Sequence, residues 1–438
     1  MRLARCFPIT LLSGSRDKAS PRRPAPGSPK LLHVAVDGPS LRSYFAGALA
    51  FMRSQGFEVV LAAPDGPDLA RLCRAEGARA RPVGIVRPLR PWRDFKALLE
   101  LLRIIAEERP DIVHCHTPKA ALLGVLAAFA LRIPHRIYHL RALPLETQRG
   151  PMRWLLYASE LLISQLCTET VAISDSLRRA YRRHLGLHRV PIAVHGVGSG
   201  NGVDARGRFD PERIDTERLN AFRRQIGLPA DARTLCFVGR LARDKGLIEL
   251  HDAWQRLRRR YPELWLIVSG DEDERDPVPR ALLDAWRRDP RICMPGFVDQ
   301  RELVFAAACI NVLPTYREGF GNVLIEAAAM AIPSVASRVT GCVDATIDGV
   351  TGTLVPPRSA PALVEAIARY LEDPELRGRH GTAARRRALE EFAPERVWLG
   401  LLVHYAAALG ETRATAEATA ELSAELYQAP RRASIIGC

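Results

Sequence analysis

The sequence has no apolar run long enough to cross a membrane. Its longest stretch of small and apolar residues, 120–131, is much shorter than the roughly 20 residues that a spanning helix needs. It has nine cysteines, an odd number, and no two of them form a CxxC pair. Disulfides and structural zinc sites are therefore not expected. The opening MRLARCFPITLLSG, broken by Pro8 and Thr10, is a poor signal peptide. These absences predict a cytoplasmic protein.

Aromatic residues are also scarce, at 6%, and no stripe of alternating cations and aromatics is present. The net charge of +14 is unevenly distributed: residues 1–200 hold 30 Lys/Arg against 15 Asp/Glu, and the rest of the chain holds 33 against 34. The basic half is suited to a polyanion, either an anionic membrane surface or nucleic acid. A proteome rich in arginine would also explain the excess. Because the aromatic stripe is missing, we expect no nucleic-acid partner.

Hydrophobic periodicity divides the chain into four parts. Residues 1–29 mix Arg, Ser and Pro without periodicity and are predicted to be a disordered leader. Residues 30–205 and 206–410 are predicted to be two domains, joined where Gly, Asn and Asp concentrate and periodicity disappears. Residues 411–438 form a C-terminal tail.

Short apolar segments alternate with amphipathic segments through both predicted domains. The predicted strands are 31–38, 57–64, 111–116, 135–141 and 169–174, then 233–241, 264–271, 291–298, 310–315 and 333–337. The predicted helices are 41–56, 92–110, 118–133, 151–166 and 175–186, then 246–262, 279–289, 301–308 and 322–331. This alternation predicts two parallel α/β sheets with helices on both faces. Ligands of such sheets bind beyond the carboxyl ends of the strands.

The segment REGFGNVLIE, residues 317–326, contains a glycine loop with one carboxylate before it and one after it. It follows a predicted strand and opens a predicted helix, so its amides lie at a helix N-terminus, which attracts anions. Asn322 is a plausible N-cap of that helix. Carboxylates before and after the loop can accept hydrogen bonds from sugar hydroxyls. The segment therefore predicts a site for a diphosphate with a sugar at each end, made by Glu318, Gly319, Phe320, Gly321, Asn322 and Glu326.

The E-x7-E spacing of Glu318 and Glu326 resembles that of retaining glycosyltransferases of family 4. Further segments resemble blocks of that family in the expected order: DIVHCHTPKA, FVGRLARDKG, LWLIVSGD and PGFVD. The resemblance covers residues 31–400. It implies the GT-B architecture, in which two Rossmann-like, doubly wound domains face each other across a cleft.

The same resemblance implies roles for individual residues. Glu318 would contact the donor sugar, and Glu326 would contact the ribose of the nucleotide. Arg240 and Lys245 would bind the diphosphate, where two cations can stabilise the charge on the departing nucleotide. His116 would lie near the donor sugar and the acceptor.

Acceptor-side candidates are Gly38, Lys119 and Arg141. Family relatives often carry paired glycines after the first strand, whereas this chain has Gly38 alone. No metal and no cofactor are predicted. His114 and His116 point to one side of a strand, but the sequence shows no third ligand suitably placed near them. The acidic residues 271–273 are interpreted as a solvated turn.

The resemblance implies that a hexose or N-acetylhexosamine moves from a nucleotide-diphosphate sugar, by default UDP, to a glycan. Similarity of the HTPKA and LPLE segments to bacterial polysaccharide enzymes implies a polyprenyl-diphosphate-linked acceptor and a role in cell-surface polysaccharide synthesis. Two alternatives are a nucleotide-sugar 2-epimerase of the same architecture and a noncatalytic nucleic-acid-binding protein. Because the basic half is suited to anionic lipid, we expect peripheral contact with the inner face of the plasma membrane. The 151–166 helix is a candidate for that contact, with core packing as the alternative.

Overall fold

The computed structural model describes residues 27–36, 41–187 and 191–410. The predicted leader lies outside the described residues except for its last three positions, and the predicted tail lies wholly outside them. Gly38 also lies outside them.

The described chain forms two compact units. The first runs to Asn201 and resumes at Pro394, and the second spans Gly202–Ala393. The sequence placed the domain junction near residue 205 and assigned residues 394–410 to the second domain. The structure instead places the last helix, α16 (Pro394–Ala408), in the first unit.

The first unit contains a seven-stranded parallel sheet in the order β3-β2-β1-β4-β5-β6-β7. Its strands are β1 (Lys30–Val34), β2 (Glu58–Ala63), β3 (Arg79–Pro82), β4 (Ile112–His116), β5 (His135–Leu140), β6 (Glu169–Ala172) and β7 (Ile192–Ala193). Its other helices are α1 (Leu41–Phe45), α2 (Ala48–Ser54), α3 (Pro67–Glu76), α4 (Pro91–Glu108), α5 (Pro118–Ala130), the 3₁₀ turn η1 (Pro144–Glu146), α6 (Pro151–Leu166) and α7 (Asp175–Leu185).

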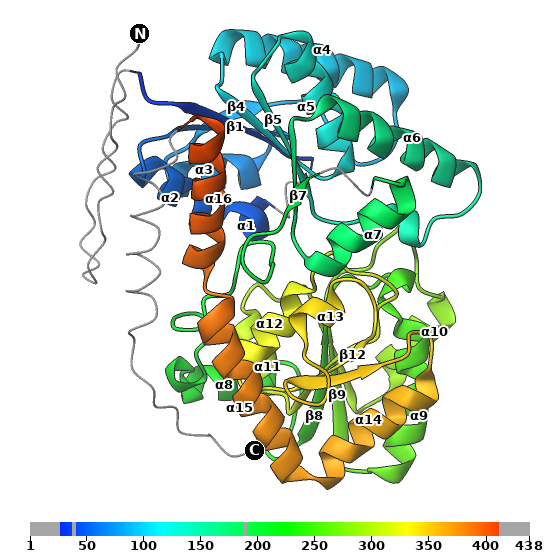
Figure 1. The fold of residues 1–438 in the computed structure, drawn as a ribbon. Helices are drawn as coiled ribbons and strands as arrows, with labels where there is room; N and C mark the ends of the chain where they lie inside the picture. The colour runs from blue at the N-terminus through cyan, green and yellow to red at the C-terminus, as the bar shows by residue number, and fades with distance from the viewer. Residues whose placement is uncertain (1–26, 37–40, 188–190, 411–438) are drawn as a thin grey trace. The chain divides into compact units, whose positions relative to one another are not determined.

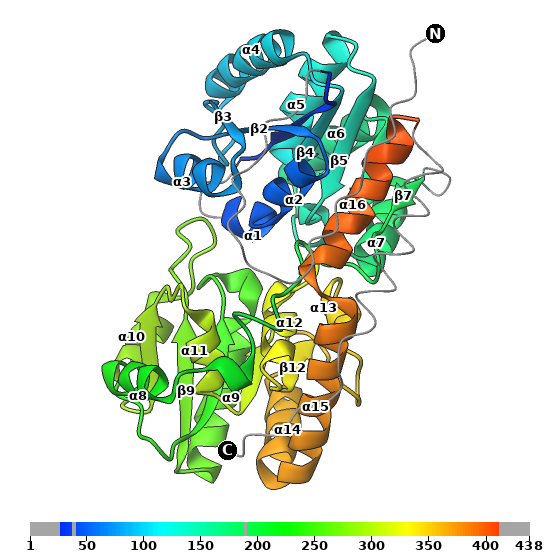
Figure 2. The ribbon, with the colours of Figure 1, turned by 90° about the vertical axis from the view of Figure 1, so that its left-hand side faces the viewer.

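Helices cover both faces of this sheet. Successive residues of β4 point in opposite directions, so Cys115 faces Gly124 of α5 whereas His114 faces Tyr405 of α16. Helices α4, α5 and α6 pack side by side on the α5 face (Figures 1 and 2). Helix α16 packs against α2 on the opposite face (Figure 1). All five residues of β4 are buried, as expected for a parallel strand covered on both sides.

One predicted helix is divided in two. The sequence predicted a single helix over residues 41–56, but α1 ends at Phe45 and α2 begins at Ala48. Gly47 has φ of 78°, and a Cβ there would overlap the Trp398 ring of α16. The helix is therefore interrupted where α16 contacts it, at a residue that tolerates positive φ.

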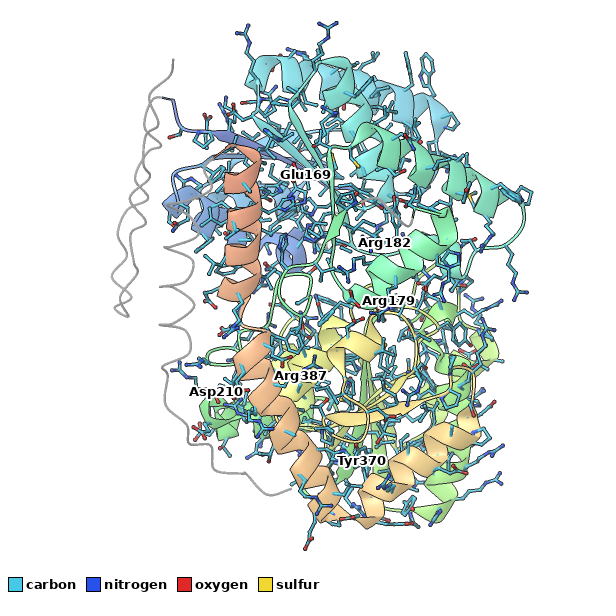
Figure 3. The ribbon with its side chains drawn as sticks, in the orientation of Figure 1. Glu169, Arg179, Arg182, Asp210, Tyr370 and Arg387 are labelled. Carbon is cyan, nitrogen blue, oxygen red and sulfur yellow. The ribbon has the colours of Figure 1, made fainter. Side chains whose placement is uncertain are left out.

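Helix α16 completes the core of the first unit. Leu399, Leu402 and Tyr405 belong to the same buried cluster as Leu31 of β1 and Phe57. Oε2 of Glu169 in β6, labelled in Figure 3, lies 2.6 Å from His404 Nε2 of α16. The interaction with His404 is the largest cause of the lowered pKa of Glu169.

The second unit contains a six-stranded parallel sheet in the order β10-β9-β8-β11-β12-β13. Its strands are β8 (Arg233–Val238), β9 (Leu264–Ser269), β10 (Ile292–Gly296), β11 (Ile310–Leu313), β12 (Ser334–Ser337) and β13 (Gly352–Val355). Its helices are η2 (Pro211–Arg213), α8 (Thr216–Gln225), η3 (Arg243–Lys245), α9 (Leu247–Arg260), α10 (Arg280–Arg288), α11 (Arg301–Ala306), α12 (Asn322–Ala329), α13 (Cys342–Ala345), α14 (Ala360–Glu372) and α15 (Pro374–Glu391). The predicted fold class, two doubly wound parallel sheets, is confirmed.

No helix in the described part of the chain is both long enough and apolar enough to span a bilayer.

A carboxyl group is buried inside the first unit. Glu160 of α6 is 1% exposed, and its Oε1 accepts a hydrogen bond of 3.2 Å from the Tyr138 hydroxyl. Its Oε2 is buried and has no partner among the described residues. Burial raises the pKa of Glu160 from 4.5 to about 8, because the charged form loses its hydration.

Glu160→Gln should therefore alter how stability depends on pH. Between pH 4.5 and 8 the unfolded chain ionises Glu160 while the native protein keeps the proton, so stability falls as pH rises and the full loss is reached above pH 8. The slope from this one group is at most about 1.4 kcal/mol per pH unit. We expect the variant to lose this slope and to melt at a higher temperature than the wild type at pH 8. Thermal midpoints from pH 5 to 9 check this, and an unchanged slope would contradict it.

Candidate functional site

The strand order of the second sheet reverses between β8 and β11. The chain runs from β8 outward through β9 to β10, and then returns to place β11 on the other side of β8. Such a reversal opens a crevice beyond the carboxyl ends of the two strands, where open α/β sheets bind ligands. Arg240 and Lys245 follow β8, and Glu318 follows β11.

Lys245 and Glu318 meet at this crevice. The Lys245 ammonium donates a hydrogen bond to Glu318 Oε1, although 73 residues separate them in sequence. Their side chains are only 13% and 16% exposed, which strengthens the attraction between their charges. The structure thus brings together two residues that the sequence assigned to the donor site.

Close backbone packing fixes the two loops that carry this pair. Gly246, directly after Lys245, has φ of 70°, and a Cβ there would overlap the Pro314 carbonyl oxygen. The Asp244 carbonyl accepts hydrogen bonds from Tyr316 N at 2.8 Å and from Thr315 Oγ1 at 3.1 Å. Backbone contacts therefore fix the register between the loops, and the ion pair of Arg317 with Asp244 at 3.2 Å joins the same two loops.

The glycine loop packs against a glycine that the sequence did not indicate. A Cβ on Gly341 would lie 2.7 Å from both Gly319 C and Phe320 N. The Phe320 ring is buried and packs edge-on against Phe392 at 5.5 Å between centroids. No sequence signal identified Gly341, because its requirement comes from the loop that folds onto it.

The predicted cap of α12 is wrong by one residue. Gly321, with φ of 83°, occupies the N-cap position, and Asn322 is the first residue of the helix. Asn322 Oδ1 is buried without a hydrogen-bond partner among the described residues. A glycine is favoured at the cap because the chain adopts a left-handed conformation there.

Arg240 is held by Asp273, a residue whose burial the sequence did not indicate. Asp273 was taken as part of a solvated turn, but it is 8% exposed and forms an ion pair with Arg240. Arg275 also binds it, with Nε to Oδ1 at 2.8 Å and Nη2 to Oδ2 at 2.7 Å. These hydrogen bonds, chiefly those from Arg275, lower the pKa of Asp273 well below its usual value. Asp273 therefore stays ionised and fixes Arg240 beyond the end of β8.

Glu326 lies inside α12 and is 6% exposed. Its Oε1 lies 3.0 Å from Arg301 Nη2 of α11, and its Oε2 is buried without a partner among the described residues. Burial raises its pKa, and Arg301 partly offsets that effect. A buried oxygen that still lacks a donor is suited to a ligand hydroxyl.

His116 belongs to a group of four buried histidines in the first unit. His33 of β1 lies opposite His114 of β4, and His116 of β4 lies opposite His139 of β5. Arg141 Nε donates to His116 Nδ1 at 3.1 Å, and His116 Nε2 lies 2.9 Å from His33 Nδ1. Because Arg141 can only donate, His116 carries its proton on Nε2 and passes a hydrogen bond to His33. Both nitrogens of His116 are therefore bonded within the protein.

The remaining imidazoles form a second chain. His114 Nδ1 lies 2.5 Å from the Tyr405 hydroxyl, and His114 Nε2 lies 3.1 Å from His139 Nδ1. Burial, with a contribution from Arg141, lowers the pKa of all four histidines, that of His33 to about 3. All four are thus uncharged at neutral pH.

A metal was not predicted because the sequence showed no third ligand near His114 and His116. That reason was wrong. His33, His114 and His116 have ligand atoms within 4.8 Å of one another. His33, in the middle of the apolar segment LLHVAV, was the sequence feature that could have indicated this group. A dication here would nevertheless lie beside the Arg141 cation, and no carboxylate contributes to the group. The hydrogen-bonded imidazoles are sufficient to explain the group without a metal.

Lys119 is an ion-pair partner of α4. Its Nζ lies 2.6 Å from Asp94 Oδ1 and donates a hydrogen bond of 2.5 Å to the Pro88 carbonyl. These contacts join the start of α5 to the start of α4.

Two protein families match this chain. Residues 41–198 match the family described as "Glycosyl transferase 4-like domain", and residues 220–387 match "Glycosyl transferases group 1". Together the two regions span most of the chain.

Curated relatives cover nearly the whole sequence. A capsular polysaccharide biosynthesis glycosyltransferase, CapM, from Staphylococcus aureus is 29% identical over 369 residues, which is 84% of this chain and 94% of that protein. A D-inositol 3-phosphate glycosyltransferase from Saccharomonospora viridis is 28% identical and spans 92% of this chain and 98% of its own length.

Solved structures share the fold. HepE from Anabaena, in complex with UDP and glucose, superposes with a TM-score of 0.71 at 20% identity, covering 86% of this chain and 99% of its own. A UDP-GlcNAc 2-epimerase from Neisseria meningitidis superposes with a TM-score of 0.63 at 14% identity, covering 85% and 98%. At these identities the similarity establishes the GT-B fold alone.

Gly246→Ala should separate the two loops that carry Lys245 and Glu318. Gly227→Ala is a matched control, because Gly227 has φ of 71° and open space where a Cβ would lie. Both variants incur the left-handed penalty of about 1–2 kcal/mol. Only Gly246→Ala also clashes with Pro314, which should add about 1–3 kcal/mol. Thermal unfolding of both variants measures the difference, and equal losses would show that the loops are not held by this contact.

Proposed function

This chain belongs to glycosyltransferase family 4, and we propose that it transfers a hexose or N-acetylhexosamine from a UDP-sugar to a polyprenyl-diphosphate-linked glycan. The observation that carries the proposal is the meeting of Lys245 and Glu318 at the strand reversal of the second sheet. UDP is proposed as the nucleotide because the similar HepE structure holds UDP and glucose.

The proposed reaction retains the anomeric configuration. The bond between the anomeric carbon and the diphosphate oxygen breaks, the acceptor oxygen bonds to the same face of that carbon, and the acceptor proton moves to the departing phosphate. Lys245 and Arg240 stabilise the negative charge that develops on the nucleoside diphosphate. No protein nucleophile takes part.

The remaining site residues orient the donor. Glu318 accepts hydrogen bonds from hydroxyls of the donor sugar, and Glu326 Oε2 accepts one from the ribose. The Gly319–Asn322 segment supplies backbone amides at the start of α12, where an anionic group is favoured. His116 can bind a donor or acceptor hydroxyl directly only by exchanging its bond with His33.

The proposed acceptor class rests on the relative from Staphylococcus aureus. That protein acts in capsular polysaccharide biosynthesis and matches 94% of its length to this chain. Assembly of a cell-surface glycan on a polyprenyl diphosphate would take place at a membrane, and the surface of the first unit is suited to that setting.

Large apolar side chains are exposed where α4 and α6 begin. The exposed fractions are 58% for Leu89, 79% for Trp92, 51% for Phe95, 72% for Trp154 and 48% for Leu155. Both helices follow strands of the parallel sheet, so their first turns lie at its carboxyl edge.

Exposed cations accompany these apolar residues: Arg90, Arg93, Lys96 and Arg149. Tryptophan with flanking cations suits an anionic lipid surface, because the ring enters the interface while the cations contact headgroups. We propose that this apolar and basic surface rests on the inner face of the plasma membrane.

Lys245→Ala should lower sugar transfer at least about a hundred-fold, because the developing phosphate charge loses a preorganised partner. The variant should still fold, although its thermal midpoint should fall because Glu318 loses its partner, so transfer is measured well below that midpoint. Transfer of labelled sugar from UDP-glucose and UDP-N-acetylglucosamine to lipid-linked glycans from a polysaccharide-producing bacterium provides the measurement.

The control for this variant is Arg243→Ala, which removes an exposed cation from the same turn. It should transfer sugar at the wild-type rate. Near-normal transfer by Lys245→Ala would refute its phosphate role. Conversion of UDP-N-acetylglucosamine to its 2-epimer without acceptor would support the epimerase alternative.

The double variant Trp92→Ser/Phe95→Ser should bind phosphatidylglycerol vesicles at least about ten-fold more weakly than the wild type. Phe129→Ser is the matched control, because Phe129 is also 51% exposed but lies at the end of α5, at the opposite edge of the sheet. Cosedimentation measures binding, and wild-type affinity should fall with added salt. Equal loss in both variants, or equal binding to phosphatidylcholine, would refute the proposed surface.

A further inference from the structure

Two arginines in the described chain are more than nine-tenths buried, and their surroundings differ. Arg385 of α15 and Arg141, which follows β5, are each 8% exposed. Arg385 Nη2 lies 2.7 Å from Oδ1 of Asp210, which is labelled in Figure 3, so its charge is compensated. Arg141 forms no ion pair with any carboxylate among the described residues.

The partners of Arg141 are all neutral. Its Nε donates to His116 Nδ1 at 3.1 Å, and its Nη1 donates to the Gly200 carbonyl at 3.0 Å. The ring of Tyr44 lies 4.3 Å from the guanidinium carbon. Three contacts thus hold the guanidinium, and its Nη2 has no hydrogen-bond partner among the described residues.

Burying such a charge is unfavourable unless an opposite charge accompanies it. Burial lowers the pKa of Arg141 to about 10, so the group remains a cation at neutral pH. The neighbouring histidines cannot compensate it, because they are uncharged and carry no negative form near neutral pH. No carboxylate among the described residues supplies a counter-charge, so the buried guanidinium is suited to an anionic ligand.

The location of Arg141 indicates which molecule that is. Arg141 lies at the carboxyl edge of the first sheet, one strand from the reversal between β1 and β4. This is the ligand-binding edge of an open parallel sheet. The same edge carries the exposed apolar surface at the starts of α4 and α6, where a lipid-linked substrate would arrive.

We propose that Arg141 binds the diphosphate of the polyprenyl-linked acceptor. A guanidinium presents paired N–H groups whose geometry matches phosphate oxygens, and Nη2 is available to supply them. His116 and Gly200 hold the fork in place, and Tyr44 covers one face of it. The identity of the anion rests on the proposed function, whereas the anion site itself rests on the burial, the neutral partners and the position of Arg141.

The test is calorimetric titration of the full chain, saturated with UDP so that the donor site is occupied. Farnesyl diphosphate and inorganic pyrophosphate are the probes. We expect both to bind the wild type, and Arg141→Gln to weaken both at least ten-fold. Arg141→Lys, which keeps the charge but loses the fork, should recover only part of the affinity. Arg136→Gln is the matched control, because Arg136 of β5 also donates to a carbonyl, that of Leu166, at 2.8 Å. Its affinities should equal those of the wild type.

Thermal unfolding without probe separates binding from a purely structural role. Removing an uncompensated buried cation should leave the melting temperature of Arg141→Gln equal to or above that of the wild type. A large drop, with probe affinity unchanged in the folded protein, would overturn the proposal.

The titration also separates this inference from the proposed function. Wild-type protein that binds neither probe at millimolar concentration refutes the anion site. Binding of pyrophosphate through Arg141 with no gain from the farnesyl chain supports the anion site and assigns it to a free or differently carried diphosphate. Protein that binds farnesyl diphosphate through Arg141 but transfers no sugar refutes the proposed function and leaves the anion site standing.

Discussion

The contact between the Gly246 backbone and the Pro314 carbonyl is the constraint on which the second unit's site depends. It joins the loop after β8 to the loop after β11, and it thereby places a cation from one loop beside a carboxylate from the other. Lys245 and Glu318 need no special affinity for each other to meet there. Their positions follow from a close backbone approach that only glycine permits.

The two units differ in how far their buried polar groups form ion pairs. In the second unit buried carboxylates pair with arginines, as in Asp273 with Arg240 and Glu326 with Arg301. The first unit has such pairs too, as in Asp94 with Lys119, but it also buries neutral imidazoles, a protonated carboxyl at Glu160 and the cation Arg141, which has no carboxylate partner among the described residues. The proposed donor site, which would accept a charged diphosphate and release it, is suited to paired charges that can exchange partners. A neutral, polar interior instead holds one cation rigidly in place.

The sequence was sufficient for the fold class and for the pairing of Lys245 with Glu318 in one site. Continuous apolar strands, amphipathic helices and glycine turns are local signals, and they predicted helices such as 151–166 correctly to the residue. Contacts between distant segments were not predictable in this way. Gly47 divides a helix because Trp398 lies against it, and Asp273 is buried because two arginines converge on it. His33 and His139 were not predicted to join this group, because three strands must be aligned in register before the four imidazoles become neighbours.

Helix α16 has a consequence for biosynthesis. It supplies Leu399, Leu401, Leu402 and Tyr405 to a core whose other members come from the first part of the chain. A ribosome that has produced the whole seven-stranded sheet has therefore still not delivered the residues that complete the cover of one of its faces. The nascent first unit must wait, with part of that apolar face and His114 uncovered, until nearly two hundred further residues have been translated. The second unit, whose sequence is contiguous, has no such delay and can be complete before the first.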